Sequence, residues 1–138
     1  TRSVIPRDET SRGHETHWNV MPAPKDNEPE YVFLHELSQT PQGTGLVVAW
    51  NPKLRLGLQL EYTKQNLPYF MQWKSIASGD YVMGLEPANS LVYGRAYHHQ
   101  RGDVHMLAPL ASETNVLTFT ILDGEEERNQ ALTRLQEP

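Results

Sequence analysis

Leucine stands at every second position from residue 54 to residue 60, and Tyr62 continues the series. The positions between them hold polar or small residues: Arg55, Gly57, Gln59, Glu61 and Thr63. Strict alternation of this kind is typical of a β-strand with one face in the core and the other in water. It is the clearest pattern in the chain, and any fold proposed for the protein has to accommodate this strand.

Further short apolar runs recur along the chain, and turn residues such as Asn51-Pro52-Lys53 and Ser78-Gly79-Asp80 separate them. Short strands that follow one another at this spacing indicate an antiparallel β-sandwich or barrel. We therefore predict an all-β fold. The expected strands are 30–37, 45–50, 54–63, 68–73, 81–85, 105–107 and 115–123.

Both ends of the chain lack this pattern. Residues 1–29 combine four prolines with scattered charges, and we predict an irregular arm apart from a helical turn near residues 8–12. Residues 30–123 form the predicted sandwich. Residues 124–138 place three glutamates before two arginines, which suits a helix dipole, so this tail is expected to be a short helix capped by Asp123 or a frayed end.

The chain has 138 residues, a formal net charge of −5 and no cysteine. This length favours one domain. The lack of cysteine excludes disulfides, thiolate metal sites and a cysteine nucleophile, and it fits the reducing cytoplasm in which we expect the protein. The acidic balance disfavours nucleic-acid binding, which needs clustered lysine and arginine. No apolar run approaches the roughly 18 residues of a membrane span, and the first residues carry no signal-peptide core.

Glu86 is the first candidate for chemistry because it directly follows an apolar run and is fixed by Pro87. A carboxylate at a strand end can face a cleft, and one held against apolar walls can act as a general acid or base. The alternative is an ordinary solvated glutamate at the end of a strand. The sequence pattern alone favours that alternative.

Gln72, Trp73 and Lys74 bring an amide, an indole and an ammonium together at another strand end. Sugars are bound by such groups, because an aromatic face covers their C–H groups while amides and charges bind the hydroxyls. An ordinary strand with a half-buried tryptophan explains the same residues, and it is the default interpretation.

The six histidines do not predict a metal site. His14 and His17 lie in the irregular arm, and neighbouring residues 98 and 99 point to opposite faces of an extended chain. His35 shares a strand face with apolar residues, so it faces either the core or a pocket, and a structural role is the default. No phosphate loop, dinucleotide turn or nucleophile elbow is present, and we expect no cofactor.

The order of these motifs resembles an uncharacterised bacterial family related to the aldose 1-epimerases, the galactose mutarotase-like proteins. Its most specific part is residues 81–89, Tyr-Val-Met-Gly-Leu-Glu-Pro-Ala-Asn, preceded by the Gln-Trp-Lys run at 72–74. Supporting segments occur in the same order as in the family: Pro-Arg-Asp-Glu at 6–9, Trp-Asn at 18–19, residues 30–37, and Gly-Arg at 94–95. The resemblance covers nearly the whole chain.

The resemblance implies a galactose mutarotase-like supersandwich with an open sugar-binding face, of which this chain is the C-terminal half. It also implies that Glu86 is the general base that takes the proton from the anomeric hydroxyl, while a histidine protonates the ring oxygen. Gln72 lies where these enzymes hold the sugar, and His35 lies near a strand that carries a substrate-binding acid in them. The remaining residues that fit the pattern as lining of the pocket are Trp73, Lys74 and Asn89.

None of the six histidines matches the acid histidine of that family, which lies upstream of the segment covered here. The resemblance therefore implies that the chain alone is not a competent enzyme. Its expected partners are a monosaccharide or sugar derivative, and either the missing N-terminal half or a second copy in a homo-oligomer.

Two other functions remain open at this stage. A carbohydrate-binding module on the same scaffold would keep Trp73, Gln72 and Lys74 but would not need Glu86 to exchange protons. A different sugar chemistry, such as elimination or glycoside cleavage, could use the same carboxylate, because a fold does not determine a function.

Overall fold

A computed structural model describes residues 1–136 of the chain. They form seven strands, one 3-10 helix and two α-helices. The chain divides into two compact units: the first contains Thr1–Leu37 and Pro68–His105, and the second contains Ser38–Leu67 and the chain from Met106 on. In order, the elements are β1 (Ser3–Pro6), η1 (Glu15–His17), β2 (Tyr31–Glu36), β3 (Thr44–Asn51), β4 (Leu56–Thr63), β5 (Tyr69–Ala77), β6 (Asp80–Ala88), α1 (Arg95–Arg101), β7 (Leu117–Asp123) and α2 (Glu125–Gln136).

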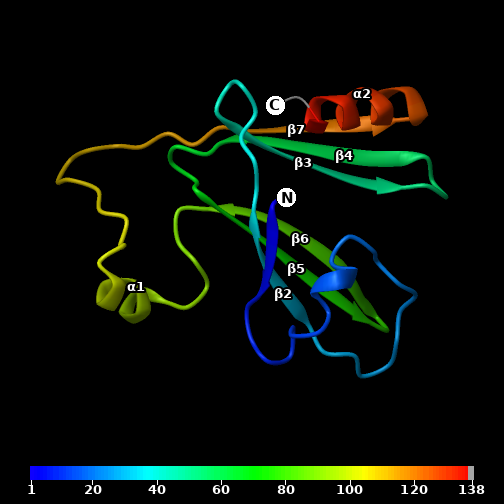
Figure 1. The fold of residues 1–138 in the computed structure, drawn as a ribbon, viewed down its shortest axis with the longest axis horizontal. Helices are drawn as coiled ribbons and strands as arrows, with labels where there is room; N and C mark the ends of the chain where they lie inside the picture. Colours follow the sequence, from blue (N-terminus) through cyan, green and yellow to red (C-terminus); the bar gives the residue numbers. More distant parts are fainter. Residues whose placement is uncertain (137–138) are drawn as a thin grey trace. The chain divides into compact units, whose positions relative to one another are not determined.

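The first unit is built on an antiparallel sheet with the strand order β1-β2-β5-β6 (Figure 1). Strands β5 and β6 form a tight hairpin in which Ala77 pairs with Asp80, and Gly79 takes the positive φ of 84° that the turn requires. One face of the sheet carries the core residues Tyr31, Phe33 and Ile76. Residues from the N-terminal arm pack on that face, so the arm is part of this unit's core.

The arm contains a strand that the sequence pattern does not predict, while most of residues 7–29 lies outside regular secondary structure. Strand β1 pairs with β2 at the edge of the sheet, and η1 adds a helical turn. Asp8 accepts hydrogen bonds from the backbone N–H and the hydroxyl of Ser11, and Ser11 in turn accepts one from the N–H of Val32. A four-residue edge strand is too short to show a period of 2, which is why the pattern missed it.

The second unit contains the antiparallel sheet β3-β4-β7 and helix α2 (Figure 1). Three of the four alternating leucines lie on β4, where Leu60 and Tyr62 are fully buried, whereas Leu54 is exposed in the turn before the strand. Helix α2 contacts β3 and β7. One guanidinium nitrogen of Arg134 donates to both carboxylate oxygens of Glu61, and Arg128 lies over the ring of Trp50. The short helix predicted for the tail is confirmed up to residue 136, and residues 137–138 lie outside the described residues.

Two further expectations fail in the region between β6 and β7. Helix α1 was not predicted, because its seven residues are mostly polar or basic and carry no apolar period. The strand expected at residues 105–107 is wrong: the segment is irregular, and Met106 and Leu107 are exposed. Pro109, which has no N–H to donate to a sheet, follows this short run closely and disfavours a strand there.

The prediction of an all-β fold with antiparallel strands is confirmed by both sheets. The predicted boundaries at residues 29 and 123 differ from the division into two compact units, which crosses them. Among the helices of residues 1–136, none has the length and apolar character needed to cross a membrane.

Candidate functional site

The register of β5 and β6 decides which candidate residues can act together. Glu86 pairs with Met71 and Gly84 pairs with Trp73, whereas Gln72 pairs with Leu85. Directly paired residues share a face, and neighbours along a strand alternate between faces. Glu86 and Trp73 therefore lie on one face of the sheet, and Gln72 lies on the other.

Glu86 is half-buried on its face of β6, and its side chain lies over Gly84. A Cβ placed on Gly84 would come within 2.5 Å of Glu86 Oε1 and within 3.4 Å of Trp73 Cβ. A glycine at this position thus leaves the space that the carboxylate occupies. Within residues 1–136, Glu86 forms no ion pair or hydrogen bond, so its oxygens are available to an incoming group.

Lys74 lies on the opposite face and is buried under the N-terminal arm. Its Nζ donates hydrogen bonds to the backbone carbonyls of His17, Trp18 and Val20, at 2.9, 3.4 and 2.6 Å. Burial lowers the pKa of Lys74 from its usual value. These three carbonyls supply the hydrogen-bond acceptors that the buried ammonium group needs. In the structure, Lys74 therefore holds the arm against the sheet.

Gln72 and His35 share the face of Lys74. The Gln72 amide donates to the carbonyl of Trp18 at 3.1 Å, and its oxygen lies 3.3 Å from His35 Nε2. The ring of His35 is packed edge-on against Trp18 and Phe70. Burial lowers the pKa of His35 to about 4, although the hydrogen bond to Gln72 opposes this shift.

The structure therefore divides the predicted site residues into separate groups. Glu86 and Trp73 lie together on one face of the first sheet. Gln72, Lys74 and His35 lie together on the other face, where they bind the arm and one another. A ligand held at Glu86 would be separated from the second group by the sheet itself.

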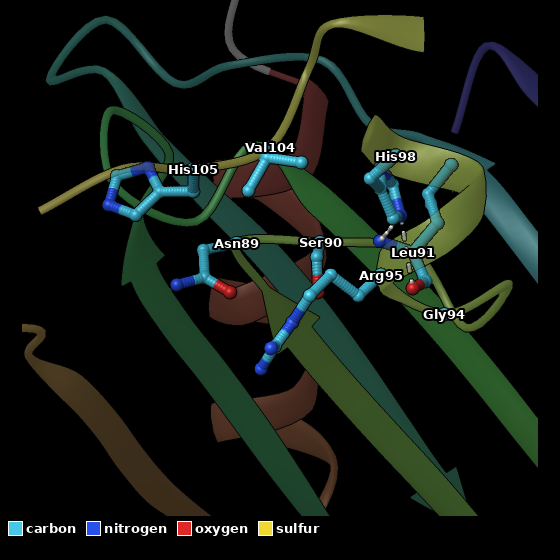
Figure 2. Close-up of a pocket in the computed structure, with 8 residues that line it drawn as sticks. All are labelled: Asn89, Ser90, Leu91, Gly94, Arg95, His98, Val104 and His105. Atoms are coloured by element: carbon cyan, nitrogen blue, oxygen red, sulfur yellow. Dashed lines mark hydrogen bonds between the residues drawn. The ribbon is translucent and has the colours of Figure 1, made fainter. Parts of the chain in front are cut away.

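Asn89 belongs to a third place, a partly open pocket of about 200 Å³ just beyond the end of β6 (Figure 2). The pocket is lined by Asn89, Ser90, Leu91, Gly94, Arg95, His98, Val104 and His105. Its walls come from the connection between β6 and α1, from α1 itself, and from the segment that follows α1. Asn89 thus lines a pocket, and its contact with a sugar stays a prediction.

His98 lies buried on helix α1, and its hydrogen-bonding role there was not indicated by the sequence pattern. Its Nδ1 lies 2.9 Å from Asp103 Oδ1, and its Nε2 lies 3.1 and 3.2 Å from the backbone N and O of Leu91 (Figure 2). Arg101 binds the other oxygen of Asp103 at 2.9 Å. The spacing of His98, Gly102 and Asp103 could have indicated a capped helix end, because Gly102 takes the left-handed conformation there.

No group of three or more histidine, aspartate or glutamate side chains within residues 1–136 is placed to hold a metal ion. His14 stacks on Tyr31, and the hydroxyl of Thr16 contacts His17. The histidine pair of the arm thus has packing partners instead of a shared centre.

Comparison with known proteins gives a family and a fold. A family model described as "Domain of unknown function (DUF4432)" matches residues 1–121. No curated protein sequence matches the chain. A crystal structure of a "putative aldose 1-epimerase" from Klebsiella pneumoniae subsp. pneumoniae MGH 78578 matches 96% of this chain with a TM-score of 0.90 and 21% sequence identity.

The structural match confirms the fold prediction: the chain has the antiparallel β architecture of an aldose 1-epimerase-like protein, with a short C-terminal helix. It covers only 35% of the chain of that solved structure. Identity at this level supports the fold and leaves the chemistry to be argued from the residues.

Proposed function

Because the chain belongs to the family described as a domain of unknown function, DUF4432, its activity has to be argued from its residues, and we propose an aldose 1-epimerase-like activity. The protein would interconvert the α and β anomers of a monosaccharide or sugar derivative. Glu86 would act as the general base. The scaffold supports this proposal, because it is shared with the protein described as a "putative aldose 1-epimerase".

One observation supports the proposal most: the unpaired carboxylate of Glu86 lies beside Trp73 in a space left by Gly84. A general base must be within hydrogen-bond reach of the proton that it removes. A carboxylate already bound to a lysine or arginine would have to break that ion pair first. The indole of Trp73 offers the flat apolar surface on which a sugar ring can stack.

The reaction requires two proton transfers. Glu86 takes the proton of the anomeric hydroxyl while an acid protonates the ring oxygen, and the bond between C1 and the ring oxygen breaks. Rotation about C1–C2 presents the other face of the aldehyde. Reversal of both proton transfers closes the ring as the opposite anomer, so atoms and charges balance over the cycle.

The acid in this proposal is not one of the histidines of the first sheet. His35 is the histidine of strands β1, β2, β5 and β6, and it lies on the face opposite Glu86. We propose that the acid comes from a part of the active enzyme outside this sheet, as the resemblance to the mutarotase-like family implies. The lack of cysteine supports a cytoplasmic location for that enzyme, again as a proposal.

A carbohydrate-binding module is the second candidate. The placement of Trp73 beside an available carboxylate favours it as well, because that pair can bind a sugar without proton transfer. In the module, binding would not depend on the titration of Glu86, and no acid would be required.

Nuclear magnetic resonance separates the candidates. Saturation transfer from the complete protein to a panel of sugars reports binding, and exchange spectroscopy at C1 of the same sugars reports anomerisation. Accelerated exchange supports the epimerase. Binding without acceleration would favour the module, and a new product in the spectrum would favour elimination or glycoside cleavage.

A further inference from the structure

The pocket beyond β6 combines the apolar side chains of Leu91 and Val104 with polar groups, and its charged lining residues are of one sign. Its side chains include the amide of Asn89, the hydroxyl of Ser90, the guanidinium of Arg95 and the imidazole of His105. No aspartate or glutamate is among its lining residues. Its volume of about 200 Å³ is below the ~300–1,000 Å³ of sites for drug-sized ligands, which suits a single small group.

Arg95 is the cation of this pocket, and it forms no ion pair within residues 1–136. The nearby acid, Asp103, is already bound by His98 and Arg101. In Figure 2 the side chain of Arg95 extends from the start of α1 past Ser90 in the direction of Asn89. A guanidinium presents a planar set of donors that matches phosphate and carboxylate oxygens.

The walls of the pocket are held in place by hydrogen bonds that a ligand does not have to supply. His98 binds the backbone of Leu91 on one side and Asp103 on the other. Leu91 follows the lining residues 89 and 90, and Asp103 precedes the lining residues 104 and 105. A site whose walls are fixed in advance loses less entropy when it binds a ligand.

The pocket also lies close to Glu86 along the chain. Asn89 lies three positions after Glu86, and three extended residues span at most roughly 10 Å. A single monosaccharide with a charged substituent bridges such a separation.

We propose that this pocket binds the anionic substituent, a phosphate or a carboxylate, of the sugar whose anomeric carbon meets Glu86. Arg95 binds the charged oxygens, and Asn89 and Ser90 donate further hydrogen bonds. The inference rests on the proposed epimerase function and narrows its substrate class to acidic or phosphorylated sugars.

Calorimetric titration of the complete protein with inorganic phosphate tests the pocket without any sugar chemistry. We expect Arg95→Gln to weaken phosphate binding by about ten-fold or more, because a charge-assisted hydrogen bond is lost. Arg95→Lys should restore part of the binding. The matched control is Arg12→Gln, an exposed arginine of the arm that pairs with Glu9, and it should bind phosphate as the wild type does. Equal affinity in wild type and Arg95→Gln would overturn the proposal.

A second titration compares glucose, glucose 6-phosphate and glucuronate to distinguish the source of the anion. Tighter binding of either charged sugar than of glucose, lost in Arg95→Gln, supports the inference and names the group. If glucose is anomerised as fast as both charged sugars and phosphate does not bind, this inference fails and the epimerase stands. If phosphate binds through Arg95 and no sugar is anomerised, the proposed function fails and the anion site stands.

Discussion

Gly84 is the residue that shapes the surroundings of Glu86. We predict that Gly84→Ala displaces the carboxylate, because the added Cβ would lie 2.5 Å from Glu86 Oε1 in its present position. The oxygen is the end of a flexible side chain, so the free energy of unfolding should change by no more than about 1 kcal/mol. Anomer exchange should fall roughly 10- to 100-fold, as expected for a misplaced catalytic group.

A double-mutant comparison provides the control for this prediction. Adding Gly84→Ala to a protein that already carries Glu86→Gln should cause no further loss of exchange. A large further loss would show that Gly84 acts through something other than the carboxylate.

His35 gives the fold a pH dependence whose sign follows from burial. The unfolded chain binds a proton on this ring near pH 6.5, while the folded chain does so only near pH 4. The stability contributed by neutral His35 is therefore present above pH 6.5 and is lost as the pH falls toward 4, by up to about 3 kcal/mol. Urea unfolding at pH 7 and at about pH 4.5 measures this loss.

The variant His35→Gln should show a smaller loss of stability over that pH range, because it has no ring to titrate. The exposed His99→Gln on α1 is the control, and it should keep the wild-type dependence. Identical behaviour of all three proteins would contradict the assignment to His35.

At the scale of elements, the sequence predicts strands better than it predicts which faces they share. The alternation around Leu58 and Leu60 is local, so β4 could be found directly. The opposition of Glu86 and Gln72 depends on the register of the β5–β6 hairpin. The sequence predicts a turn at residues 78–80, whereas in the structure Ala77 pairs with Asp80 and the turn consists of Ser78 and Gly79 alone. A shift of one residue in the register moves all side chains of a strand to the other face of the sheet.

The arm and the first sheet are joined by a buried cation, which is a long-range feature that no local pattern shows. We predict that Lys74→Met lowers the free energy of unfolding by about 1–3 kcal/mol, because the carbonyls of His17, Trp18 and Val20 lose their common donor. Hydrogen exchange should accelerate in residues 17–22. Lys53→Met, at an exposed turn, is the control, and unchanged exchange in Lys74→Met would exclude the anchoring role.

At the scale of the whole molecule, the second sheet leaves apolar surface on an edge strand. Phe119 and Ile121 on β7 are each 61% exposed, and they share one face. Exposed apolar edge strands promote association. This exposure agrees with the proposal that a further segment or a second copy completes the domain. The sequence could not predict it, because the alternation of apolar residues at 115–123 predicts a buried face.

We therefore predict that the isolated chain associates with itself in sedimentation velocity experiments as its concentration rises. The double substitution Phe119→Thr with Ile121→Thr should weaken this association and preserve the strand. The control Leu135→Gln removes an exposed leucine from α2 and should leave association unchanged. A chain that stays monomeric at every concentration would show that this face needs no cover.

The central claim is that Glu86 transfers the proton of the anomeric hydroxyl, and the rate of anomer exchange in the complete protein tests it most directly. For Glu86→Gln we predict a rate about 10²- to 10⁴-fold below that of the wild type, with sugar binding retained. The exposed Glu30→Gln serves as the matched control and should exchange anomers at the wild-type rate. Exchange by Glu86→Gln at the wild-type rate would contradict the account.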